Sequence, residues 1–219
     1  MFALVNKSDN SIIQTYSGVR GITIGENQYP QTIFTLWTEA ERNAIDIYTI
    51  EMDNSKFKNE QWYNNTDITY SFDGSKAKGS YGDATAKAHA DVNHVWTQEE
   101  IDDGEAPDGT SEGDAKKDDD GNQLITRGLK YILIKKIKDQ AEGELNKTDW
   151  YVIRKTEEDI AIPSTITTHR KAVRTKQAEM ETAITNASDT PALETLYTYT
   201  EQEDGSVTRP LGELPTLED

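Results

Sequence analysis

The sequence predicts an α+β fold with a small, mainly-β N-terminal domain, an acidic linker and a C-terminal helical hairpin module. Three observations lead to this prediction. Short β-branched runs separated by turn residues occupy residues 1–95, which is typical of strands. Residues 96–121 hold eleven Asp and Glu against two Lys. Apolar residues at helical spacing return over residues 122–200, and an extended tail is expected over residues 201–219.

The N-terminal domain is expected to alternate strands and turns. Strands are expected around residues 12–13, 22–24, 45–50 and 68–72, with turns at residues 6–10, 25–27 and 73–74. One short helix interrupts them, because Thr38 and Glu41 have the spacing of a capping box. In that motif each side chain binds the backbone N–H of the other residue. Trp37 precedes this helix and is placed to pack against its first turn.

The acidic linker accounts for more than half of the net charge of −17. Its Gly, Asp, Glu, Pro and Ser residues bury too little apolar area to offset chain entropy, so we expect it to be flexible in the free protein. This charge disfavours nucleic acid and anionic membranes as partners, since both bind basic surfaces. It favours a partner that carries a basic surface.

Composition excludes several kinds of chemistry. The chain has no Cys, which excludes disulfides, Cys-ligated zinc and thiol catalysis. Residues 1–10 lack the basic start and apolar run of a signal peptide, and the longest apolar run, residues 131–134, is far too short to span a bilayer. We therefore expect a cytoplasmic location until an assembly incorporates the chain. With 34% hydrophobic residues, two small cores are expected rather than a single large one.

Two long helices are expected in the C-terminal module, over residues 122–146 and, after Pro163, over residues 164–187. The apolar face of the first helix is formed by Leu129, Ile132, Leu133, Lys136 and Ile137. The stripe of the second is formed by Ile166, Val173, Met180, Ile184 and Ala187. These faces suit packing of the two helices against each other, although the second stripe equally suits a neighbouring subunit. A third, short helix is expected over residues 191–197.

The connection between the two long helices, residues 148–163, exceeds the ~2–8 residues usual for a helical hairpin. It is therefore expected to have structure of its own. Thr148 and Asp149 are N-cap types, and a short helix is expected to follow to about Glu158. In one interpretation Trp150 and Ile153 face inward and close the end of the hairpin. In the other, the aromatic residues here anchor a protein interface.

Residues 148–174 also resemble a C-terminal module of tail-associated and tail fibre assembly proteins of tailed bacteriophages, including marine phages. The shared pattern is T-D-W, then R, I-P, Y/H-R and V/L-R. It is matched here by Thr148-Asp149-Trp150, Arg154, Ile162-Pro163, Arg170 and Val173-Arg174. His169 stands where Tyr or another aromatic residue is common. The N-terminal region resembles a small β domain seen with that module, through Met1-Phe2-Ala3, Tyr29-Pro30, Trp37 and Ile47-Tyr48.

The resemblance implies a structural protein of the virion tail or of tail-fibre attachment, present in multiple copies and bound to other phage structural proteins. The alternative is a tail fibre assembly chaperone that acts in the host cytoplasm and is not retained in the virion. The family has no catalytic residues, so no enzyme activity, cofactor or metal is expected, and neither nucleic acid nor a membrane is an expected partner. The candidate interface residues are Trp96, Trp150, Tyr151, Arg154, Arg170 and Arg174.

Three further patterns have simpler interpretations. His89 and His94 are spaced to bind a metal, but such residues are more often polar surface groups. The run Asp118–Gly121 fails as an EF-hand loop, because Lys116 and Arg127 would occupy its first and last ligand positions. A basic helix face is formed by Arg170, Lys171, Arg174 and Lys176. It suits a solvated surface, or a docking site for the acidic linker, better than it suits nucleic acid.

Overall fold

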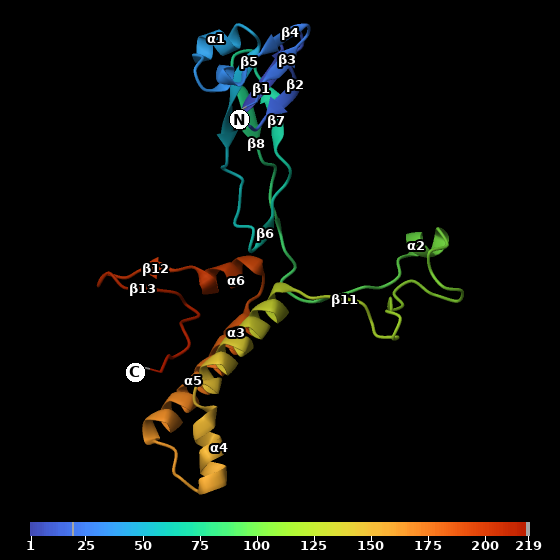
Figure 1. The fold of residues 1–219 in the computed structure, drawn as a ribbon. Helices are drawn as coiled ribbons and strands as arrows, with labels where there is room; N and C mark the ends of the chain where they lie inside the picture. The colour runs from blue at the N-terminus through green and yellow to red at the C-terminus, as the bar shows by residue number, and fades with distance from the viewer. Residues whose placement is uncertain (19, 218–219) are drawn as a thin grey trace. The chain divides into compact units, whose positions relative to one another are not determined.

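The computed structural model describes residues 1–18 and 20–217. It has mixed α and β structure, with strands in its N-terminal part and helices in its C-terminal part (Figure 1). The chain forms two compact units, unit 1 (Met1–Thr85) and unit 2 (Ala86–Asp219). Within the described ranges, no helix is both long enough and apolar enough to span a membrane.

Unit 1 is built on a five-stranded sheet with the order β2-β1-β5-β8-β7. Its strands are β1 (Phe2–Asn6), β2 (Ser11–Tyr16), β5 (Ile47–Asp53), β7 (Thr69–Phe72) and β8 (Ala77–Ser80). β5 and β8 run parallel, and the other neighbouring strands run antiparallel. The outermost strands β2 and β7 also contact each other, so the sheet curls toward a barrel.

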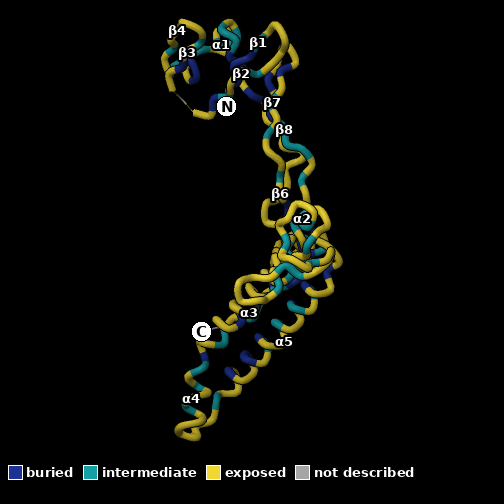
Figure 2. The backbone as a smooth tube through the Cα atoms, turned by 90° about the vertical axis from the view of Figure 1, so that its right-hand side faces the viewer, coloured by how far each residue is buried: buried dark blue, intermediate teal, exposed yellow. Residues whose placement is uncertain are grey.

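Each face of this sheet has its own apolar core, because side chains alternate along a strand. In β1, Ala3 and Val5 belong to one core and Leu4 belongs to the other. Residues from three further elements complete the second core: β3 (Ile22–Ile24), β4 (Asn27–Tyr29) and the 3-10 helix η1 (Gln31–Phe34). These cores are the dark blue stretches among the strands in Figure 2.

The predicted capping box is confirmed at the start of α1 (Glu39–Asn43). The backbone N–H of Thr38 donates to Glu41 Oε2 over 2.7 Å, and the N–H of Glu41 donates to Thr38 Oγ1 over 3.3 Å. The remaining strands near the end of this unit are β6 (Tyr63–Asn64) and β9 (Thr85–Ala86), and β9 leads into unit 2.

Unit 2 is centred on two antiparallel helices, α3 (Leu129–Asn146) and α5 (Ser164–Asn186). Lys130 Nζ donates to the carbonyl of Thr185 over 2.8 Å at one end of the pair, and Arg170 Nη1 donates to the carbonyl of Leu145 over 2.7 Å at the other. The seam buries Leu129, Leu133, Ile137, Ala141, Ile166, Val173, Met180 and Ile184. All five residues of the predicted second stripe are buried. Ile132, expected on the inner face of the first helix, is instead 52% exposed.

The start of α3 differs from the prediction, since residues 122–128 are not helical. Ile125 and Thr126 form β11 (Ile125–Thr126), which pairs with β10 (Val92–Asn93). The carboxylate of Asp91 accepts hydrogen bonds from the N–H of Gly128 (2.9 Å) and from Arg127 Nη1 (2.6 Å). These long-range bonds hold the residues before α3 in an extended conformation, so the helix begins at Leu129.

The same contacts explain why the units divide after Thr85 and not after residue 95. The carbonyls of Ala88 and His89 accept hydrogen bonds from the first two amides of α3, both over 2.9 Å. Thr190 Oγ1 donates to the carbonyl of Lys87 over 2.6 Å. Residues 87–93 are therefore bonded to α3, to β11 and to the start of α6 (Thr190–Tyr197), and they belong to unit 2.

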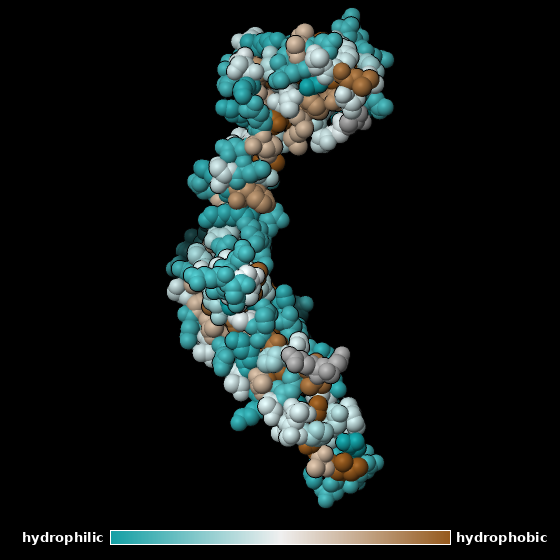
Figure 3. Space-filling model, turned by 90° about the vertical axis from the view of Figure 1, so that its left-hand side faces the viewer, coloured by the Kyte–Doolittle hydropathy of each residue, from teal (hydrophilic) through white to brown (hydrophobic). Residues whose placement is uncertain are grey.

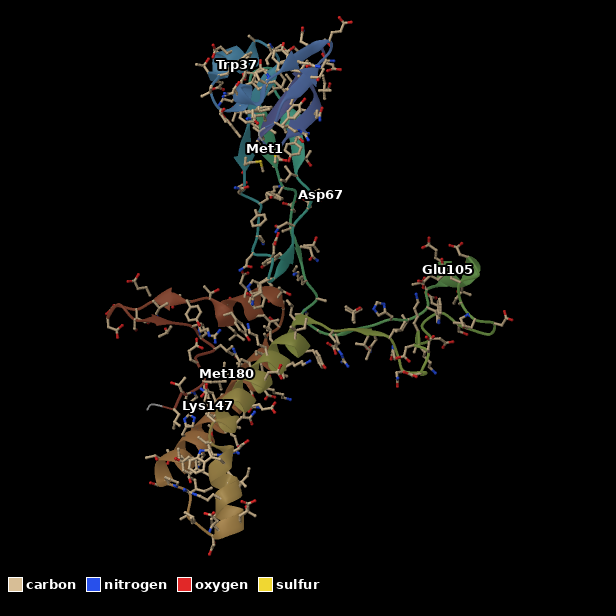
Figure 4. All side chains as sticks on the ribbon, viewed as in Figure 1. Met1, Trp37, Asp67, Glu105, Lys147 and Met180 are labelled. Carbon is tan, nitrogen blue, oxygen red and sulfur yellow. The ribbon has the colours of Figure 1, made fainter. Side chains whose placement is uncertain are left out.

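The acidic segment, residues 96–121, is not a linker between two lobes in this structure. Because β10 pairs with β11, the two ends of the segment lie side by side within unit 2. The chain between them folds back on itself as an arm, which contains the short helix α2 (Gln98–Asp102) and carries Glu105 at its far end (Figure 4). Backbone hydrogen bonds join the two sides of the arm, as between Trp96 and Asp114 (2.9 Å).

The C-terminal segment also has more structure than the extended tail expected over residues 201–219. β12 (Thr200–Glu201) and β13 (Val207–Thr208) form a short hairpin, turned at Gly205 with φ of 79°. Beyond the hairpin, Leu211 is buried, and its N–H donates to the carbonyl of Leu196 over 3.1 Å. Residues 218 and 219 lie outside the described residues.

Candidate protein-interaction surface

Arg170 sits inside unit 2, at the end of the helix pair where α3 gives way to α4 (Asp149–Glu158). The residue is only 9% exposed. Nη1 donates to the carbonyl of Leu145 and to Thr148 Oγ1, each over 2.7 Å, and forms an ion pair with Asp149 Oδ1 at 2.8 Å. We call these four residues the Arg170 node. Arg170 was predicted as an interface residue, but its hydrogen bonds and its ion pair are made within its own unit.

Thr148 bonds to two other members of this node. The residue is fully buried, and its hydroxyl donates to the carbonyl of Leu145 over 2.9 Å while it accepts from Arg170. Buried polar groups are stable only when they are hydrogen-bonded. The Thr-Asp of the phage-like pattern and the Arg of its Y/H-R step therefore form one polar cluster that joins α5 to the α3–α4 junction.

Beyond the node the chain turns outward, and none of the residues of α4 is buried. We call residues 150–160 the α4 tip. Its exposed large apolar side chains, with their exposed fractions, are Trp150 (49%), Val152 (39%), Ile153 (55%) and Ile160 (44%). The prediction that Trp150 and Ile153 face inward is therefore wrong. Hydrophobic atoms at this end of unit 2 are visible as brown surface in Figure 3.

The aromatic part of the α4 tip is held in place by its own neighbours. The rings of Trp150 and Tyr151 lie 3.7 Å apart between centroids, and the guanidinium carbon of Arg154 lies 4.7 Å and 5.3 Å from those two centroids. Cation–π contact of this kind stabilises an exposed aromatic group without burying it. Aromatic side chains fixed before binding lose less conformational entropy when a partner covers them.

Only some of the charged side chains on and beside the tip form ion pairs. Asp149 pairs with Arg170, and Lys155 pairs with Asp159 at the end of the helix. Within the described part of the chain, Glu157 and Glu158 form no ion pair. The tip therefore exposes apolar side chains next to two carboxylates, Glu157 and Glu158, that form no ion pair within the described residues.

Trp96 lies in the acidic arm and is partly buried there. Lys116 Nζ lies 4.5 Å from its ring centroid and also forms an ion pair with Glu100. Glu100 in turn forms a capping box with Thr97 at the start of α2. The ion pair with Lys116, aided by the Thr97 hydrogen bonds, lowers the pKa of Glu100 to about 2. Trp96 is thus already in contact with other residues of the arm.

Arg174, the last candidate, is exposed on α5 and lines a shallow cavity together with Leu145 and Gln177. Lys176, two residues further along α5, pairs with Glu179 at 3.5 Å. In the described ranges, no side chain of residues 96–121 forms an ion pair with α5. The predicted docking of the acidic segment on this basic face is therefore not among the ion pairs of the structure.

His94 and Asp118, from the two patterns that resemble metal sites, make ordinary polar contacts. His94 Nε2 lies 2.6 Å from Thr126 Oγ1 in β11. Asp118 Oδ1 accepts hydrogen bonds from the backbone N–H groups of Asp120 and Asn122. Among residues 1–18 and 20–217, no three His, Asp or Glu side chains are grouped so as to hold a metal ion.

Two features of these sites were not predicted from the sequence. The spacing Thr97-x-x-Glu100 is the same capping-box signal that located α1, but it lies in a stretch whose composition suggested disorder. Arg170 stands four residues after Ile166 and three before Val173, on the predicted buried stripe, so its burial was readable from helical periodicity.

Comparison of the chain with protein-family models, with curated proteins and with solved structures gives no match. A functional assignment therefore depends on the phage-like pattern and on the surfaces described above. Residues of that pattern lie in the Arg170 node and in the α4 tip.

Proposed function

We propose that this chain is a structural component of a bacteriophage virion, located in the tail or at the attachment of a tail fibre, and that it acts by protein–protein contacts. The observation that supports this proposal is the α4 tip. An amphipathic helix with four exposed large apolar residues in and just after it is typical of a segment that lies in a groove of another protein.

The phage-like pattern divides into two roles in this proposal. Thr148, Asp149 and Arg170 fix the base of the tip, and Trp150 with Arg154 forms its outer surface. The pattern then describes a contact helix that is held at its base, with a fold-forming half and a partner-facing half. In this proposal residues 122–200 act as a helical hairpin module, and the α4 tip is the end of the hairpin that contacts the partner.

The proposed partners are other phage structural proteins of the tail or tail fibre. Unit 1 contacts one component and the α4 tip contacts another, and the acidic arm adds a surface for a basic partner. The chain is present in several copies in the virion and occupies the host cytoplasm during assembly. No catalytic step, cofactor, nucleic acid or membrane forms part of this proposal.

The alternative is a tail fibre assembly chaperone that leaves before the particle is complete. It is favoured by the arm, in which eleven Asp and Glu stand against two Lys. A strongly acidic surface accelerates encounter with basic partners but is screened by salt, and this suits a transient complex.

Quantitative mass spectrometry of purified phage particles and of the infected lysate tests the proposal. A structural protein is expected in particles at a fixed ratio to a known tail subunit, and the ratio should survive a high-salt wash. Abundance in the lysate together with absence from particles would overturn the structural role and support the chaperone.

A further inference from the structure

The N-terminus of α5 has the features of an oxyanion site. α5 is a helix of 23 residues whose N-cap residue is Pro163, with no side-chain cap and no acidic residue in its first turn. The first amides of a helix have no intrahelical acceptor. Here the N–H of Thr167 bonds to the carbonyl of Pro163 over 3.1 Å, which leaves the three preceding amides at the positive end of the helix dipole.

A cavity of about 480 Å³ lies beside this end of the helix, between α5 and the C-terminal segment. Its lining consists of Ser164, Thr165, Thr168, His169, Thr216 and Leu217. Among the described residues no carboxylate belongs to this lining, and three of its members are hydroxyl residues of the first turns of α5. The described lining is therefore rich in hydrogen-bond donors.

His169 provides a second, independent indication of a ligand. The residue is only 9% exposed, it lines the cavity, and its Nε2 has no hydrogen-bond partner in the described part of the chain. Buried polar atoms in proteins are nearly always paired, so the unpaired ring nitrogen of a residue that lines a cavity indicates a missing partner. An imidazole N–H donates well to an anionic oxygen.

We infer that this cavity binds an oxyanion, whose oxygens accept hydrogen bonds from the amides of the first turn of α5, from the Thr165 and Thr168 hydroxyls and from His169. The shared chemistry is that of a compact anionic oxygen group, supplied either by a phosphoryl group or by the carboxylate of a partner protein. Helix N-termini favour both kinds of anion. This inference does not depend on the phage assignment.

Amide NMR titration of the full chain tests the inference, with inorganic phosphate in one series and acetate in the other at constant ionic strength. Progressive, saturable shifts are expected at Thr165 and Ile166. In T165V/T168V the apparent affinity should fall at least about tenfold, the effect of losing one charge-assisted hydrogen bond. T175V, at an exposed position on the same helix, should bind like the unmodified chain.

The two series separate the sources of the anion. Saturation by phosphate alone indicates a phosphoryl ligand, saturation by acetate alone indicates a carboxylate, and saturation by both supports the shared chemistry. Both series are repeated on E218Q/D219N, so that the acidic side chains that follow Leu217 in the sequence do not compete. The absence of saturable shifts in every series, or equal shifts in T165V/T168V, overturns the inference.

H169Q provides a second readout, since Gln keeps a donor while H169F removes it. With circular dichroism showing that both variants remain helical, H169Q should retain binding and H169F should lose at least about tenfold in affinity. Equal affinity in the two variants would show that His169 does not contact the anion.

Discussion

The two ends of the α3–α5 pair differ in how their polar and apolar groups are satisfied. Where α3 begins, the amides of Gly128, Leu129 and Lys130 are bonded by groups from residues 88–91 of the same unit. Where α3 ends, the Arg170 node pairs polar groups of the α3–α4 junction with one another, but no residue of α4 is buried. The polar groups at the first end are bonded within the unit, whereas the second end leaves apolar side chains exposed.

The largest effect is expected at the boundary between the node and the α4 tip. R170M keeps the volume of the side chain but removes the ion pair with Asp149 and leaves Thr148 without its donor. Because Thr148 is fully buried, we expect the free energy of unfolding of unit 2 to fall by about 3 kcal/mol. Urea unfolding followed by far-ultraviolet circular dichroism measures this loss.

R174M is the matched control, because Arg174 is exposed on the same helix and forms no ion pair within the described residues. Its unfolding free energy should change by less than about 0.5 kcal/mol. Equal losses in the two variants would contradict the structural role given to Arg170.

The opposite end of the pair is tested at Gly128, with Gly143 near the other end of α3 as the comparison. A Cβ at position 128 would lie 2.2 Å from the carbonyl oxygen of Ala90. This is a backbone atom, so a side-chain rotation cannot relieve the clash. G128A should therefore detach residues 88–91 from the start of α3 and lower stability by about 2 kcal/mol. Amide hydrogen exchange at Leu129 and Lys130 measures the detachment.

G143A is expected to act in the opposite direction. Gly143 lies within α3, and a Cβ there meets nothing within 4 Å. Replacing a helical Gly by Ala stabilises a helix by about 1 kcal/mol. If G128A were as harmless as G143A, residues 88–91 would not be what fixes the start of the helix.

The acidic arm makes a smaller, pH-dependent contribution. The pKa of Glu100 is lowered from 4.5 to about 2, first by Lys116 and then by Thr97. A group whose pKa is lower in the folded state stabilises that state above its unfolded pKa and ceases to do so as it is protonated. The stabilisation should therefore be complete above about pH 4.5 and be lost as the pH falls toward 2.

The indole N–H resonance of Trp96, followed between pH 7 and pH 2, reports the loss of structure in the arm that should follow protonation of Glu100. E100Q keeps a residue type that supports a capping box but lacks the charge that pairs with Lys116, so its transition should be shallower. A transition of the same size in both proteins would show that other carboxylates of the arm control it.

The parts of the fold that local chemistry determines were predictable from the sequence. The start of α5 follows Pro163, α1 follows its Thr38 capping box, and the buried stripe of α5 follows helical periodicity. The start of α3 was not predictable, because Ile125 and Thr126 are drawn into β11 by residues more than thirty positions earlier. No local signal records such a pairing, and composition alone misled the prediction for residues 96–121.

The candidate surface was predicted as a set of residues more accurately than as a set of orientations. Helical spacing shows that Trp150 and Ile153 share a face of α4, but not which side another element covers. α3 ends at Asn146, before α4 begins, and the contact between them is slight. The two residues therefore face solvent, while Arg170, predicted at the surface, forms the buried node.

The smallest effect on folding, and the most informative one, is expected at the tip itself. Ile153 is 55% exposed, so I153S removes little buried area and should lower the unfolding free energy by less than about 1 kcal/mol. I132S is the matched control, since Ile132 is 52% exposed on α3 and lies outside the tip. Both variants should unfold at nearly the same urea concentration.

Incorporation into particles is expected to distinguish the two substitutions where folding does not. If the α4 tip lies in a groove of another tail protein, I153S should reduce the amount of this chain per particle several-fold, because central apolar residues provide most of the binding energy of such contacts. I132S should leave it unchanged. An equal content of both variants would remove the tip from the contact and leave unit 1 and the acidic arm as the surfaces to test.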